Sequence, residues 1–313
     1  MSLVKVFEDS IYPTSIVHLD PLTKELSPED SPLFVWIPGN PGLLEYYVDF
    51  LALVHKKNPT WEVLGISHAG MSYDGNEKKK KTSSNDKFKV FDLEEQVQHK
   101  VDIINKFSSK NRPLIIMGHS VGAYLTQRVI MTNKLNGKLI KVGYLTPTVV
   151  DIHLSDKGIK MTKVFNWTSN LPHHVGWISQ FIFHKLLPLF FVKFFISKMI
   201  KCSEDSNAVL ASGTLLRNAN LIEQALGLAT YEMEAIHDDW GFHKKLIDYC
   251  NETGVKTWFL FAEDDHWVAH STRKEVIDFY QYHNKPENIR IDIDTIPHAF
   301  VIKKSKYIVD QYF

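Results

Sequence analysis

Gly118-His119-Ser120-Val121-Gly122 matches the pattern G-x-S-x-G, which presents a serine hydroxyl for nucleophilic attack on an acyl group. A short apolar and β-prone run precedes the motif at 113–117, and residues 123–130 read as a helix. Strand, tight turn, serine and helix together form the context of a nucleophile elbow. The glycines permit the sharp turn, and the helix N-terminus favours developing negative charge. The motif therefore predicts Ser120 as a nucleophile.

A serine hydroxyl needs a base that takes its proton and an acid that orients the base. When the serine sits on such an elbow, the acid and the histidine follow it along the chain in that order. His298 lies in the loop after the predicted strand 289–294, where a short turn can bring an imidazole over the edge of the sheet. We therefore expect His298 to be the base.

The acid is expected in the loop after the predicted strand 255–262. Asp264 and Asp265 are adjacent there, so only one of them can face the histidine. Asp265 is preferred because its distance from the strand end and from Val268 fits the usual G-x-x-D-x-x-V loop. Asp151, which follows the preceding strand, is a further alternative.

Acyl transfer also needs two N–H donors aimed at the oxygen that becomes negatively charged. One donor is expected to be the N–H of Val121, directly after the nucleophile. The other is expected from Pro38-Gly39-Asn40-Pro41-Gly42, which follows the first core strand. The prolines have no N–H, which leaves Gly39 and Asn40, and Asn40 is preferred.

Short apolar strands alternate with helical stretches, which predicts an α/β fold with a mostly parallel sheet flanked by helices. The alternation is lost from 151 to 240, and we interpret this segment as a helical cap inserted between the sixth and seventh strands of a single domain, 1–313. The predicted strands are 33–37, 61–66, 113–117, 138–146, 255–262 and 289–294, and the main helices are 43–55, 92–110, 271–282 and 300–313.

Composition excludes several classes of protein. The formal net charge is +0, so nothing indicates a nucleic-acid partner. Two distant cysteines make neither a disulfide framework nor a zinc cluster. Nucleotide-binding glycine motifs are absent from the sequence, and without H-E-x-x-H the neighbouring histidine pairs do not indicate a metal, so no cofactor or metal is expected. The lysine run at 78–81 is expected to be a solvated loop.

The segment between Lys157 and Lys201 contains seven lysines and no acidic residue, interleaved with aromatic and aliphatic side chains. This composition is typical of a segment that lies in a membrane interface. Lys185, Pro188 and Lys193 interrupt it, so a complete membrane span is not expected. A cap helix over an acyl-binding cleft is the alternative. The residues expected at the interface are Trp177, Phe181, Phe190, Phe191, Lys193, Phe194 and Phe195.

Four motifs together resemble the lipid-droplet-associated hydrolases, which are serine hydrolases of the α/β-hydrolase superfamily. They are the loop 37–42 with Tyr46, Tyr47 and Phe50, the elbow 118–124, Asp265-His266-Trp267 and His298-Ala299-Phe300. The resemblance covers both ends of the catalytic domain and not the cap. It implies an esterase or lipase at neutral-lipid droplets, with Ser120, Asp265 and His298 as its triad.

The predicted function is hydrolysis of neutral lipid esters, such as triacylglycerol or sterol esters, at the lipid-droplet surface. The expected location is the cytosolic face of the droplet, peripheral or monotopic, with the endoplasmic reticulum as a second location. Two alternatives stay open. One is an esterase or thioesterase for soluble substrates, and the other is a droplet-binding protein with little catalysis that tethers or remodels droplets.

Overall fold

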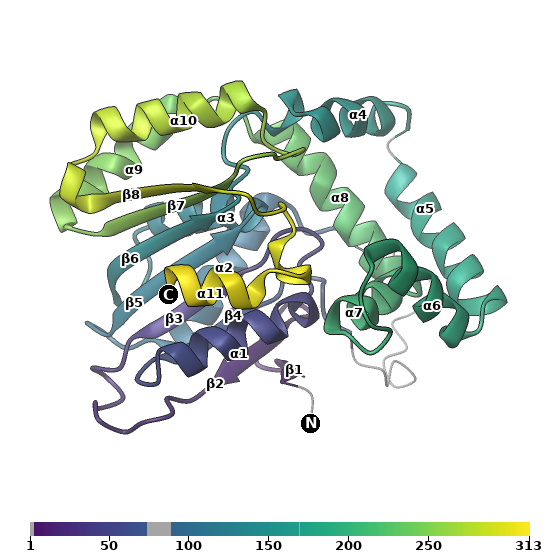
Figure 1. Cartoon of the computed structure of the whole chain (residues 1–313), viewed down its shortest axis with the longest axis horizontal. Coiled ribbons are helices and arrows are strands. Elements are labelled where there is room, and N and C mark those ends of the chain that lie inside the picture. Colours follow the sequence, from purple (N-terminus) through teal and green to yellow (C-terminus); the bar gives the residue numbers. More distant parts are fainter. Residues whose placement is uncertain (1–2, 74–88, 169) are drawn as a thin grey trace.

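The computed structural model describes residues 3–73, 89–168 and 170–313, and an eight-stranded sheet forms its centre (Figure 1). The order across the sheet is β1-β2-β4-β3-β5-β6-β7-β8; β1 and β2 are antiparallel to their neighbours and β3 to β8 are parallel. The prediction of a mostly parallel sheet flanked by helices is confirmed. The strands are β1 (Val4–Val6), β2 (Ser15–Leu19), β3 (Leu33–Ile37), β4 (Glu62–Ile66), β5 (Pro113–His119), β6 (Lys138–Leu145), β7 (Lys256–Ala262) and β8 (Ile289–Asp294).

The central strands are apolar along their whole length because helices cover both faces of the sheet. In β3, Leu33, Val35 and Ile37 point into one hydrophobic core, and Phe34 and Trp36 point into the other. All five side chains are fully buried. Strand β3 is therefore held on both faces, which fixes the position of the loop that follows it.

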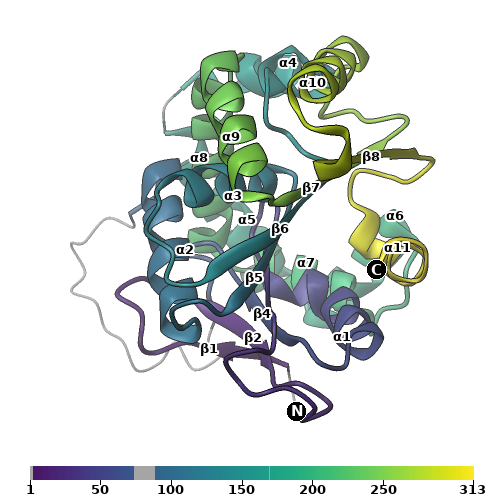
Figure 2. The ribbon, with the colours of Figure 1, turned by 90° about the vertical axis from the view of Figure 1, so that its left-hand side faces the viewer.

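Two layers of helices sandwich the sheet (Figure 2). The layer formed by α2, α3, α9 and α10 contributes to one core, and α1 and α11 contribute to the other. Helix α2 begins at a capping box in which Asp92 accepts from the N–H of Glu95 and the Glu95 side chain accepts from the N–H of Asp92. The bounds are α1 (Val48–Lys57), α2 (Leu93–Phe107), α3 (Val121–Met131), α9 (Trp240–Thr253), α10 (His270–His283) and α11 (Ser305–Tyr312).

Five further α-helices lie between β6 and β7 and gather at one side of the sheet (Figure 1). The predicted insertion between the sixth and seventh strands is thus confirmed. Helices α5 and α8 pack along each other, and α8 also contacts α4 and α7. The bounds are α4 (Asp156–Phe165), α5 (Leu171–Gln180), α6 (Leu189–Ile200), α7 (Asn207–Leu216) and α8 (Ala219–Ala235), with a π-helical turn at Phe181–Leu186.

The membrane-spanning potential of these helices is limited. In the ranges that the structure describes, no single helix combines the length and apolar composition needed to cross a bilayer. Leu171–Leu186 and Leu189–Ile200 reach that length only jointly, and they are bent by 119° at the break between them.

Several elements differ from the sequence prediction. Strands β1 and β2 were not predicted, because three and five residues with polar side chains among them are too few for a clear period. The predicted helix 43–55 is a 3-10 turn at Leu44–Tyr47 followed by α1, and the predicted helix 300–313 is a 3-10 turn at Phe300–Ile302 followed by α11. The predicted lysine loop at 78–81 lies outside the described residues.

Helix α3 lies very close to the end of β3 at Gly122. A Cβ atom there would lie 2.2 Å from the carbonyl oxygen of Ile37 and 2.5 Å from that of Pro38. We expect Gly122→Ala to destabilise the protein by roughly 2–3 kcal/mol, because two backbone segments must separate to admit one methyl group. Urea unfolding measures this difference.

Gly241→Ala in α9 is the matched control, because a Cβ atom there would meet only Asp239 Oδ1, at 3.7 Å. Alanine favours the helix over glycine, so this variant should keep or slightly raise the unfolding midpoint. Equal effects of the two substitutions would contradict the steric argument.

Candidate active site

The nucleophile elbow joins β5 to α3. Ser120 has φ 54° and ψ −124°, a strained conformation for a residue with a side chain. Its N–H donates to the carbonyl oxygen of Leu145 at 3.1 Å, which ties the turn to the end of β6. A Cβ atom at Gly118 would lie 2.1 Å from the Gly122 carbonyl oxygen, so this turn requires glycine at 118. This backbone conformation directs the Ser120 side chain away from the strand, at the carboxyl edge of the sheet.

The side chains of Ser120, Asp265 and His298 meet at this edge, although they come from three different loops. His298 Nε2 lies 2.9 Å from Ser120 Oγ, and His298 Nδ1 lies 2.8 Å from Asp265 Oδ2. A carboxylate only accepts hydrogen bonds, so in the neutral imidazole Nδ1 carries the proton and Nε2 accepts from the serine hydroxyl. This is the arrangement in which an imidazole can take the proton of an attacking serine.

The two adjacent aspartates in the loop after β7 have different surroundings. Asp264 is exposed, whereas the Asp265 side chain is only 3% exposed and its Oδ1 accepts from the N–H of Trp267 at 2.8 Å. Burial alone would raise the pKa of Asp265, but the hydrogen bond and charge of His298 and the Trp267 N–H lower this pKa overall. The Asp265 carboxylate therefore stays ionised beside the imidazole. Asp151 has no contact with His298 and pairs with other residues.

The main chain of His298 is anchored as well as its side chain. Its carbonyl oxygen accepts from His119 Nε2 at 2.9 Å and from Thr146 Oγ1 at 3.2 Å. Because His119 Nε2 is thereby a donor, His119 Nδ1 accepts from the Tyr47 hydroxyl at 2.7 Å. Burial lowers the pKa of His119 to about 3, which keeps the ring neutral. His119 and Tyr47 thus position the loop that carries His298, a role that the sequence did not reveal.

The same hydrogen-bond chain distinguishes the two candidate oxyanion donors. The N–H of Gly39 donates to the Tyr47 hydroxyl at 2.9 Å and is therefore engaged. For the backbone N–H of Asn40, no acceptor is found among the residues that the structure describes. Val121 is the first residue of α3, and an N–H at that position has no acceptor within its own helix. A Cβ atom at Gly39 would lie 2.9 Å from Ser120 Cβ, so the loop presses closely against the elbow.

The Asn40 side chain connects the oxyanion loop to the inserted helices. Its Nδ2 donates to the Ala225 carbonyl oxygen at 2.9 Å and to Glu232 Oε1 at 2.8 Å, both in α8. Glu232 is buried, and this burial raises its pKa to about 7 although the Asn40 hydrogen bond acts in the opposite direction. Because Glu232 is almost 200 residues from Asn40, only the folded chain reveals this contact.

The residues expected at a lipid interface lie on α5, α6 and the turn between them. In α6, Val192 and Ile196 are buried against Val209 of α7, which leaves the opposite side of the helix outward. The Lys193 side chain is partly exposed and lies 3.9 Å from Asp205. The aromatic side chains with exposures between 46% and 61% are those of Trp177, Phe181, Phe190, Phe191, Phe194 and Phe195.

A cavity of about 450 Å³ is lined by residues of α2, α3 and α8, including Tyr124, Arg128 and Tyr231. None of Ser120, Asp265 and His298 lines this cavity.

Comparisons with solved structures agree with the fold. The thioesterase domain of a curacin biosynthetic pathway has a TM-score of 0.60 at 13% identity, with 98% of this chain and 97% of that chain covered. A haloalkane dehalogenase from Agrobacterium tumefaciens has a TM-score of 0.65 at 12% identity, with 98% and 94% covered. At such low identities these likenesses show an α/β-hydrolase fold and not an activity.

Comparisons with protein sequences identify the family of this chain. Proteins named lipid droplet-associated hydrolase are 28% identical in Gallus gallus, with 90% of this chain and 85% of that protein covered, and 27% identical in Mus musculus, with 94% and 88% covered. The family model described as lipid-droplet associated hydrolase matches residues 30–301. The chain therefore belongs to the lipid-droplet associated hydrolase family.

Proposed function

We propose that this hydrolase is a serine esterase or lipase that cleaves neutral lipid esters, such as triacylglycerol or sterol esters, at the surface of lipid droplets. The observation that carries the proposal is the continuous hydrogen-bonded chain from Asp265 through His298 to Ser120. Acyl transfer by serine needs this arrangement. Serine, aspartate and histidine also follow one another along the chain in the order expected when the serine sits on such an elbow.

In the proposed reaction, His298 Nε2 takes the hydroxyl proton while Ser120 Oγ attacks the ester carbonyl carbon. The N–H groups of Asn40 and Val121 stabilise the negative oxygen of the tetrahedral intermediate. Asp265 stabilises the imidazolium that forms. The alcohol then leaves with the proton from His298, and an acyl-enzyme remains on Ser120. Water attacks this ester with the same imidazole as base, and the fatty acid is released.

The lipid substrate class is supported by the outer face of α5 and α6. Exposed aromatic side chains and lysines without an acidic residue between 157 and 201 suit a surface of phospholipid headgroups. We propose that residues 151–240 act as a cap on a single domain, 1–313, and that the cap docks on the cytosolic face of the droplet. The names of the relatives support this location, and the endoplasmic reticulum is the second proposed location.

Ser120→Ala should abolish hydrolysis of emulsified triacylglycerol and labelling by a covalent serine probe, because the attacking oxygen is removed. Asp265→Asn should lower kcat by about 10³–10⁴-fold, because the amide cannot hold the imidazole in the required tautomer. Rates on emulsified and on soluble esters measure both effects.

Asp264→Asn is the matched control, since Asp264 is exposed and adjacent, and its activity should equal that of the wild type. A loss of activity in Asp264→Asn and not in Asp265→Asn would contradict the assignment of the acid. Equal rates on soluble esters and emulsions would favour the soluble esterase or thioesterase. If Ser120→Ala still changes lipid droplets as the wild type does, the alternative of a droplet-binding protein that tethers or remodels droplets would be favoured.

Glu232 makes the stability of the cap contact dependent on pH. The Glu232 pKa is raised to about 7 in the folded chain from the ordinary glutamate value of 4.5. Below pH 4.5 the carboxyl is protonated in both folded and unfolded chains. Between pH 4.5 and 7 the unfolded chain releases the proton first, so stability falls as pH rises, and above pH 7 the loss is complete.

We therefore expect the wild type to lose about 2–3 kcal/mol more than Glu232→Gln in free energy of unfolding between pH 5 and pH 8. Because the comparison is a difference between two pH values, a constant effect of the substitution cancels. Urea unfolding at both pH values measures it. If the free energy of unfolding changes equally with pH in the two proteins, the Glu232 carboxyl does not titrate between pH 5 and pH 8.

Replacing Phe190, Phe191, Phe194 and Phe195 together by serine should weaken binding to phospholipid-coated triolein droplets by at least about tenfold, because each inserted ring contributes about 1.5–3 kcal/mol. Val192 and Ile196 stay in place, so the packing of α6 on α7 is retained. Flotation of droplets with bound protein measures the effect.

A variant with Ile11→Ser and Tyr282→Ser is the control, since both residues are more than 80% exposed and lie outside α5 and α6. This control should bind droplets as the wild type does. If the fourfold serine variant also binds droplets normally while remaining folded, then α6 is not the docking element.

A further inference from the structure

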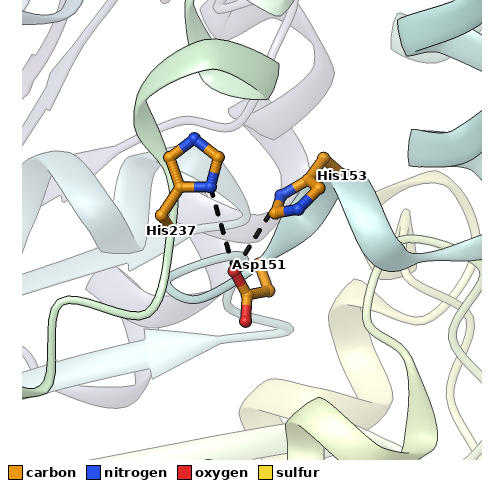
Figure 3. A group of neighbouring side chains, drawn as sticks. All are labelled: Asp151, His153 and His237. Carbon is orange, nitrogen blue, oxygen red and sulfur yellow. Dashed lines mark ion pairs between the residues drawn. The ribbon is translucent and has the colours of Figure 1, made fainter.

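Asp151, His153 and His237 form a cluster outside the proposed catalytic triad (Figure 3). The Nδ1 atoms of His153 and His237 each lie 3.9 Å from Asp151 Oδ1. All three potential ligand atoms lie within 4.8 Å of one another. The two nitrogens thus face one carboxylate oxygen at distances too long for hydrogen bonds.

The tautomer of His237 follows from its second nitrogen. His237 Nε2 donates to the carbonyl oxygen of Glu234 at 2.9 Å, so Nε2 carries the proton. In the neutral ring Nδ1 therefore directs a lone pair toward the Asp151 carboxylate. A backbone carbonyl that accepts from the second nitrogen is the usual support of a metal-binding histidine. His153 Nδ1 is buried, and it has no hydrogen-bond partner among the described residues.

Asp151, His153 and His237 carry no permanent positive charge. The imidazole rings of His153 and His237 lie 4.7 Å apart between their centroids, so both face the same small volume beside Asp151. Asp151 has φ 43° and ψ 44°, a left-handed conformation that aspartate adopts more readily than most residues.

We propose that Asp151, His153 and His237 bind a divalent zinc ion through one carboxylate oxygen and two Nδ1 atoms. Two imidazoles and one carboxylate are a typical zinc donor set, and water would complete the tetrahedron. Bonds of about 2.0–2.1 Å to zinc require ligand atoms roughly 3.4 Å apart. In the structure each Nδ1 lies 3.9 Å from the carboxylate oxygen, and all three ligand atoms lie within 4.8 Å, so side-chain rotations must bring them closer together when zinc binds. The partial exposure of both histidines leaves a path for the ion.

The position of the cluster indicates what the zinc ion would do. Asp151 and His153 lie in the connection from β6 into the inserted helices, and His237 lies in the connection that leaves α8 toward α9. One ion would therefore join the entry and the exit of the insertion. The N–H of Lys157, a few residues further, donates to the carbonyl oxygen of His266, next to Asp265. The zinc ion is thus a structural clamp beside the triad loop and takes no part in acyl transfer.

The test uses the full chain after removal of metals with a chelator. Titration with zinc sulfate in a calorimeter should give one equivalent bound, and Co²⁺ should give the visible absorption of a tetrahedral site. Thermal unfolding should shift to higher temperature with zinc and not with Mg²⁺. His153→Ala, His237→Ala and Asp151→Asn should each weaken zinc binding by at least about 100-fold, because each removes a ligand.

His270→Ala is the matched control, since His270 is an exposed histidine on α10 outside the cluster, and it should keep full binding. The readouts are metal binding and unfolding, so a failure of the proposed lipase activity leaves this test unaffected. Circular dichroism checks that each variant is folded, and Asp151→Asn is the mildest change if an alanine variant is not. The proposal is overturned if the wild type binds no zinc, or if a variant that carries Asp151→Asn, His153→Ala and His237→Ala together binds it as tightly as the wild type.

Discussion

The close packing of three loops at the carboxyl edge of the sheet governs the geometry of the candidate site. The loop after β3, the elbow after β5 and the last loop before α11 meet there in close contact. Glycine at 39, 118 and 122 is required because a Cβ atom at any of them would lie within 3 Å of neighbouring atoms. A hydrogen-bond chain through Tyr47 and His119 then holds the carbonyl oxygen of His298. The imidazole is thereby directed at Ser120 before any substrate binds, and such preorganisation lowers the reorganisation needed during the reaction.

The inserted helices have two different surfaces. On the inner side, α8 accepts both hydrogen bonds of the Asn40 amide and so contributes to the position of the oxyanion loop. On the outer side, α5 and α6 expose aromatic rings that a protein in water would ordinarily bury. Helix α8 therefore contacts both α5 and the loop after β3.

Two ionisable groups lie where the inserted helices meet the rest of the fold. Glu232 is buried, bonds to Asn40 in the loop after β3 and has a raised pKa, and the half-buried Asp151 lies where the chain enters the insertion, beside two histidines. Burial of such groups costs free energy unless each finds a partner. Asn40 is the partner of Glu232, and the zinc ion is the proposed partner of the Asp151 cluster.

Much of the site could be predicted from the sequence, because its residues lie in short motifs next to strands. The G-x-S-x-G elbow, the order of serine, acid and histidine, and the glycine-rich loop after β3 are all local patterns. They led to Ser120, Asp265, His298, Asn40 and Val121, and the structure brings these residues together. The choice between Asp264 and Asp265 rested on spacing alone, and the burial of Asp265 gives it a physical basis.

The remaining features depend on contacts between residues far apart in the chain. The sequence motifs predict no role for His119, Glu232 or His237, and they indicate Asp151 only as an alternative acid of the triad. Strands β1 and β2 are too short for a recognisable period, and they are stabilised by pairing of β1 with β2 and of β2 with β4. Local patterns therefore specified the chemistry and the order of the elements. Tertiary structure decided which polar side chains become partners, because burial and hydrogen bonding depend on distance in space rather than along the sequence.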